Sequence, residues 1–132
     1  MKNILKTFSV VALLLFATSC SREGTGGDAT IVAFLKHHGS PIKNHVGYPD
    51  TVYVKFNAKD APSGGLSKYD TYFVGEVGED HVHLPGLKWG DYYIYGCGYD
   101  STVMSRVIGG MHVKIKRSER KKEIDTDLAV SE

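Results

Sequence analysis

Residues 81–100, HVHLPGLKWGDYYIYGCGYD, constrain the fold more than any other part of this chain. They combine a short apolar segment, a turn built on Pro85, Gly86 and Gly90, and a run dense in tyrosine. Alternate side chains of a strand point to opposite faces. The two parities of the run are Tyr92, Ile94, Gly96 and Gly98, and Tyr93, Tyr95, Cys97 and Tyr99. Because both parities are apolar or aromatic, the run predicts a strand that is central in its sheet or covered on both faces.

Other segments carry the period of two that is typical of strands. Residues 51–57 place Val52, Val54 and Phe56 on one side, which indicates a half-exposed antiparallel strand. We expect Gly109 and Gly110 to interrupt the chain between two short strands, and the last two strands to pair as a terminal hairpin. The further expected strands are residues 29–37, 68–77, 106–108, 111–116 and 121–130, with a short irregular segment at 42–48.

The composition also favours β structure. The chain holds eight Tyr and 15 Gly among 132 residues, and tyrosine is enriched in strands. No segment after the first 19 residues sustains a helical period. The predicted fold is therefore all-β, a single antiparallel β-sandwich of about seven strands that occupies residues 29–132.

The N-terminal residues have the three parts of a secretory signal. Lys2 and Lys6 form a basic region, residues 8–16 are apolar, and the small residues 17–19 precede Cys20. The apolar part is too short for a membrane span with proper flanks. We predict that residues 1–19 are a removable signal peptide, which directs the chain out of the cytoplasm.

Small residues followed directly by Cys20 resemble the lipobox of bacterial lipoproteins. The resemblance implies cleavage before Cys20 and attachment of palmitate-type acyl chains, which anchor the protein stably to a membrane. Ser21 stands where Asp would favour the inner membrane, so the resemblance implies the outer membrane, with the periplasmic and surface-facing orientations both open. Residues 20–28 are then the lipidated Cys and a flexible tether. The alternative is an ordinary secretory signal with an incidental cysteine.

The turn and strand around Gly90 carry a second resemblance. A Tyr two residues after a turn Gly can bury its ring and keep its hydroxyl on a backbone group. The pattern of Leu87, Gly90, Tyr92 and Ile94 resembles the G-x-Y strand of carboxypeptidase regulatory-like domains. That family implies a transthyretin-like sandwich, close to the immunoglobulin type, across about residues 29–130. It also implies a non-enzymatic role, since such domains support or present other modules.

Catalytic motifs are not found in this sequence. It has no G-x-S-x-G elbow, no H-E-x-x-H and no phosphate-binding Gly loop. The Tyr-Arg-Gly-Ser motif of the transthyretin-related hydrolases is also absent. A net charge of +1 offers no footprint for nucleic acid. We therefore expect no enzyme and no cofactor, but a membrane-anchored extracytoplasmic lipoprotein that acts as a structural or protein-interaction module. A small protein that binds a glycan or a metal ion is the alternative.

One thiol remains after Cys20. With Cys20 lipidated, Cys97 has no partner for an intrachain disulfide. We expect Cys97 to be buried as a small apolar residue. A reactive or intermolecular thiol is the alternative.

Two sets of residues are candidate binding sites. His81 and His83 share one face of a strand and could approach one metal ion. Trp89, Tyr93 and Tyr95 could stack on sugar rings or on a partner protein. The alternative for the two histidines is that they are exposed imidazoles without a ligand. The alternative for the aromatic residues is that their rings fill the core. A third metal ligand could come from His37, His38, His45 or His112.

Overall fold

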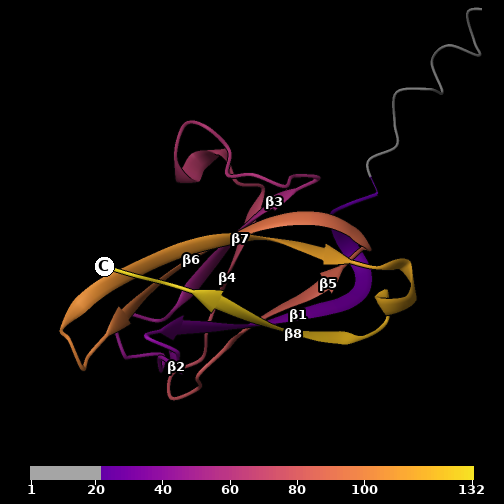
Figure 1. Ribbon diagram of the computed structural model, residues 1–132. Helices are drawn as coiled ribbons and strands as arrows, with labels where there is room; N and C mark the ends of the chain where they lie inside the picture. Colours follow the sequence, from indigo (N-terminus) through magenta and orange to yellow (C-terminus); the bar gives the residue numbers. More distant parts are fainter. Residues whose placement is uncertain (1–21) are drawn as a thin grey trace, which may run out of the picture.

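The computed structural model describes residues 22–132, so the predicted signal peptide and Cys20 lie outside the described residues. Two four-stranded sheets pack face to face (Figure 1), which confirms the predicted β-sandwich. It has eight strands, where about seven are predicted from the sequence. The strands are β1 (Thr25–His37), β2 (Ser40–Pro41), β3 (Thr51–Phe56), β4 (Thr71–Val74), β5 (Val82–Leu87), β6 (Gly90–Asp100), β7 (Ser105–Ile115) and β8 (Glu123–Ala129), with short 3-10 turns at η1 (Leu66–Lys68) and η2 (Arg117–Glu119).

The first sheet is built around the long strand β1, which pairs antiparallel with β2 and β5. The last strand, β8, runs parallel to β1 (Figure 1), with Thr30 opposite Glu123 and Lys36 opposite Ala129. The predicted terminal hairpin is therefore wrong, because β7 and β8 belong to different sheets. Alternation in a sequence fixes which face of a strand is buried, but it does not fix which strand lies beside it.

The second sheet has the order β4-β3-β6-β7, so the tyrosine-rich strand β6 is central, as predicted. The predicted interruption at Gly109 and Gly110 is wrong, because β7 runs unbroken through both. A side chain at Gly109 would collide with the carbonyl oxygen of Ala129, and one at Gly110 with the Tyr93 ring. The two glycines thus permit close packing within a continuous strand instead of ending it.

The core lies between the two sheets and follows the predicted parity. Tyr92 and Ile94 of β6 and Val52 and Val54 of β3 are completely buried. A side chain at Gly96 would collide with Leu128, so this glycine lets the facing sheet approach β6 closely.

Tyr92 ties the segment just before β1 to the sandwich. Its hydroxyl donates to the Lys88 carbonyl at 2.6 Å and accepts from the Gly24 N–H at 2.9 Å. Burial raises the pKa of this phenol above its ordinary value. Glu23 is buried beside it, and β1 begins at Thr25 rather than at the expected residue 29. Residues 25–28, expected in the tether, are therefore part of β1.

Candidate functional site

An exposed cluster of tyrosines covers the outer face of the second sheet. We call Tyr53, Tyr69, Tyr72, Tyr93 and Tyr95 the tyrosine face. Tyr72 of β4 pairs with Tyr53 of β3, and Tyr53 pairs with Tyr95 of β6. Three adjacent strands therefore place a tyrosine in one transverse row. The row follows from the strand parities, since the opposite parity of β3 and β6 fills the core.

The rings of this face touch one another. The centroids of Tyr53 and Tyr72 are 5.8 Å apart. Tyr69 enters from the segment before β4, and its ring lies 6.0 Å from Tyr53 and 6.0 Å from Tyr95. The interplanar angles at these three contacts range from 33° to 56°. Such spacings are typical of favourable aromatic pairs.

The tyrosine face is half-buried at its centre and open at its edge. Burial, followed by the charges of neighbouring phenols and of Cys97, raises the pKa of Tyr69 above its ordinary value. Burial also raises the pKa of Tyr95. Tyr72, near the edge strand, keeps 61% of its surface exposed. The rings of the tyrosine face offer apolar surface with hydroxyl groups for hydrogen bonds.

Charged groups border the tyrosine face. Lys55 pairs with Asp70 at 3.3 Å, and Asp70 also accepts the Phe56 N–H at 2.7 Å. Tyr93 lies between Lys55 and His112 in the register, and on the His112 side Asp91 contacts His112 Nε2 at 2.8 Å. The hydrogen bond with His112 lowers the pKa of Asp91. Both pairs lie along one edge of the tyrosine face, and charged groups at the edge of an apolar centre are common in protein interfaces.

Trp89 does not join the two tyrosines with which the sequence grouped it. Its ring packs against the buried core, whereas Tyr93 and Tyr95 lie on the outer face. The Arg22 guanidinium lies 4.0 Å from the Trp89 ring centroid, and that of Arg117 lies 5.9 Å away. Cation–π contacts thus occupy the ring that was expected to be open to a ligand.

His81 and His83 come together as their spacing predicts. Their Nε2 atoms are 3.0 Å apart, and His81 Nδ1 contacts Asp80 at 2.9 Å. The nearest further carboxylate oxygen to His81 belongs to Glu79, at 3.8 Å. The two imidazoles can hydrogen-bond to each other, which satisfies them without a metal ion. None of the candidate third ligands of the sequence analysis makes a contact with this pair in the described chain.

Cys97 is half-buried and lies on the outward parity of β6, beside Ile108. The prediction that Cys97 is buried is therefore met only by half. Burial raises the pKa of its thiol, which lowers the thiolate fraction at neutral pH.

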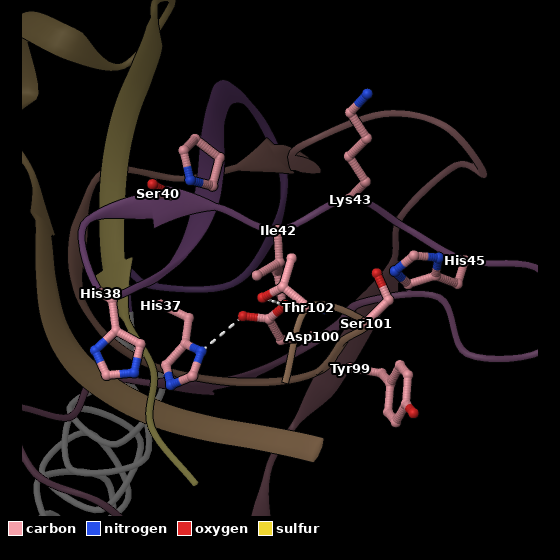
Figure 2. A pocket seen from close by; sticks show the side chains of 11 residues that line it. His37, His38, Ser40, Ile42, Lys43, His45, Tyr99, Asp100, Ser101 and Thr102 are labelled. Carbon is pink, nitrogen blue, oxygen red and sulfur yellow. Dashed lines mark hydrogen bonds and ion pairs between the residues drawn. The ribbon is translucent and has the colours of Figure 1, made fainter. Parts of the chain in front are cut away.

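A separate hollow lies at the end of the sandwich, where β1 meets β2 and the end of β6 (Figure 2). It has a volume of about 420 Å³. His37 is buried in its wall and contacts Asp100 with 2.7 Å between Nδ1 and Oδ2. The Thr102 hydroxyl and backbone N–H donate to the other oxygen of Asp100 at 2.6 and 2.9 Å. The sequence predicts His37 only as a possible third ligand beside His81 and His83, and it does not predict the pairing of His37 with Asp100.

Comparison with protein-family models, with curated proteins and with solved structures finds no match to this chain. The resemblance to regulatory-like domains and to lipoproteins therefore stays a prediction from the residues named above. Residues 22–132 contain no helix that is long and apolar enough to cross a membrane.

Proposed function

We propose that this chain is a lipid-anchored module of the cell envelope that binds a protein partner through its tyrosine face. The observation that carries the proposal is the transverse row of Tyr72, Tyr53 and Tyr95 on an open sheet surface. Tyrosine is enriched at the centres of protein interfaces, because its rigid ring gives large contact area at low entropic cost.

The surface extends beyond the tyrosines as a second row. This row crosses all four strands of the sheet and consists of Val74, Thr51, Cys97 and Ile108. Val74 is 49% and Ile108 is 48% exposed. Contiguous apolar surface of this kind on a folded domain marks sites of interaction.

A protein partner fits this surface better than a sugar. A sugar ring stacks on a flat aromatic platform, but the rings of Tyr53, Tyr69 and Tyr72 are tilted against each other by 41° and 56°. Small ligands also favour concave sites that enclose most of their surface, whereas this row crosses an open sheet. Rings that are tilted against each other instead form an uneven surface, and the side chains of another protein can fill its depressions.

The anchor would keep the tyrosine face close to the bilayer. Gly24 is held by Tyr92, and β1 begins at Thr25. The segment from Cys20 to Gly24 spans at most about 14–18 Å when extended. A partner within the same envelope layer is therefore within reach, whereas a distant one is not.

A photo-crosslinking amino acid at position 72 tests the proposal in intact cells. We expect it to join the chain to one discrete envelope protein. Position 125 is the matched control, since Asp125 is exposed on β8 in the other sheet. The double variant Tyr53→Ser/Tyr95→Ser should abolish the crosslink while the fold, followed by circular dichroism, is kept. Cys20→Ala should release the chain from the membrane fraction and weaken the same crosslink.

Two results would contradict this proposal. One is equal crosslinking from positions 72 and 125. The other is a crosslink that persists in the Tyr53→Ser/Tyr95→Ser variant. Saturable oligosaccharide binding that the same variant abolishes would instead favour the glycan alternative.

A further inference from the structure

Three metal-ligating side chains meet at the end of β1, on a different part of the molecule from the tyrosine face. Within residues 22–132, His37, His38 and Glu132 each offer one ligand atom, and these atoms lie within 4.8 Å of one another. His37 Nε2 is 4.0 Å from Glu132 Oε1. The two imidazole rings have centroids 4.0 Å apart. His81 and His83 do not belong to such a set of three.

Asp100 fixes the proton on His37. Its carboxylate lies 2.7 Å from Nδ1 of His37. The Thr102 hydroxyl and N–H donate to the other Asp100 oxygen, and Oδ2 is left to accept from His37. With Asp100 as the acceptor, Nδ1 of His37 donates, and Nε2 keeps a lone pair for a ligand. Metal-bound histidines typically donate their other N–H to a carboxylate in this way.

The backbone turn after His37 brings the two imidazoles together. Neighbouring residues on a strand point to opposite faces, which would separate His37 from His38. Here β1 and β2 are joined by the two-residue turn His38-Gly39, and both residues have positive φ, 51° and 80°. This is the pattern of a type I′ hairpin turn. Figure 2 shows the His38 ring beside that of His37 as a result.

Backbone hydrogen bonds hold the segment that carries Glu132. Ser131 exchanges two backbone bonds with Ile108, each 2.9 Å long. The Val130 N–H donates to the Lys36 carbonyl at 2.9 Å, next to His37 in the chain. The backbone as far as Ser131 is therefore tied to both sheets of the sandwich, and it brings the exposed Glu132 side chain near His37.

We propose that His37 Nε2, His38 and Glu132 bind a divalent transition-metal ion of the zinc type. Two imidazoles and one carboxylate suit Zn²⁺, with bonds of about 2.0–2.2 Å. His38 and Glu132 are exposed, so their side chains can close around an ion while buried His37 stays in place. The hollow beside His37 and His38 gives the ion a path from solvent and leaves a fourth position for water.

Competition with a chromophoric chelator measures the affinity of the full chain, purified in detergent, for Zn²⁺ alone. We expect saturable binding with a dissociation constant of about 10 μM or tighter. Both His38→Ala and Glu132→Gln should weaken it at least about tenfold. These residues are exposed, so neither variant should unfold the domain. His83→Ala is the matched control, and it should bind Zn²⁺ as the wild type does.

A thermal melt gives a second readout. Zn²⁺ should raise the melting temperature of the wild type and of His83→Ala, because a ligand that binds only the folded state stabilises it. It should not raise that of His38→Ala. The proposal is overturned by no saturable binding below about 100 μM, by unchanged affinity in both ligand variants, or by loss of binding in His83→Ala. None of these results bears on the tyrosine face.

Discussion

Replacing Tyr92 by alanine is expected to destabilise the domain by about 3–5 kcal/mol, the range for truncating a large buried aromatic side chain. The Tyr92 side chain is completely buried, and its ring packs at 5.9 Å and 88° against that of Phe56. The same change leaves the Gly24 N–H and the Lys88 carbonyl without their hydroxyl partner. The start of β1 should therefore loosen together with the core.

Urea unfolding of the full chain measures this cost. Tyr92→Phe removes only the hydroxyl and should cost about 1–3 kcal/mol, the penalty for buried polar groups that lose their partner. Tyr72→Ala is the matched control, because Tyr72 is exposed on the outer face, and it should change stability by less than about 1 kcal/mol. A cost below about 1 kcal/mol for Tyr92→Ala would mean that the inward face of β6 is assigned wrongly.

The second large effect is a loss of stability as the pH rises, caused by Asp50. This side chain is completely buried, and neither carboxylate oxygen has a hydrogen-bond partner. Two hydrogen bonds hold the backbone of Asp50 in this position. The Asn44 side chain accepts the Asp50 N–H at 2.6 Å, and the Gly75 N–H donates to the Asp50 carbonyl at 2.8 Å. Burial raises the pKa of Asp50 to about 7.

The direction of this pH effect follows from the difference in the pKa of Asp50 between the folded and unfolded chains. In the unfolded chain an aspartate titrates near pH 3.9, so between about pH 4 and 7 the folded chain binds one more proton at Asp50. The stability that this proton contributes is complete below about pH 4 and is lost as the pH rises through about 7. Asp50 should therefore lower the free energy of unfolding by about 2–3 kcal/mol between pH 5 and pH 8.

Urea unfolding at several pH values, in the wild type and in Asp50→Asn, isolates this contribution. All other ionisable groups are common to both proteins, so their contributions cancel in the difference. As the pH rises from 5 to 8, the free energy of unfolding of the wild type should fall relative to that of Asp50→Asn. Parallel pH profiles for the two proteins would show that Asp50 is ionised in the folded state already at pH 5.

Local patterns in the sequence predict the strands and their buried faces. The alternation in residues 51–57 and around Tyr92 gives the correct inward side chains, because the period of two is a property of the strand itself. The hydroxyl partner of Tyr92 follows from the turn before it. The pairing of β8 with β1, and the passage of β7 through Gly109, depend on contacts between segments far apart in the chain. Composition alone assigns such glycines to turns.

In the candidate sites too, some residues are predicted by strand parity and others are not. Parity predicts that Tyr93 and Tyr95 share a face. The part played by Tyr69 does not follow from the expected strand 68–77, because β4 begins only at Thr71 and Tyr69 lies in the segment before it. Parity also predicts the proximity of His81 and His83. It predicts the opposite for His37 and His38, which only the positive φ of the turn brings together.

Tyrosine nitration in intact cells and in the purified full chain tests the central claim, that the tyrosine face is covered by a partner, most directly. Tyr72 and Tyr48 are 61% and 55% exposed, and Tyr48 lies outside the tyrosine face, stacked on Tyr99. Both should react in the purified chain. In cells, Tyr72 should be protected severalfold while Tyr48 stays reactive. Equal nitration of Tyr72 in cells and in the purified chain would show that the tyrosine face is uncovered and contradict the claim.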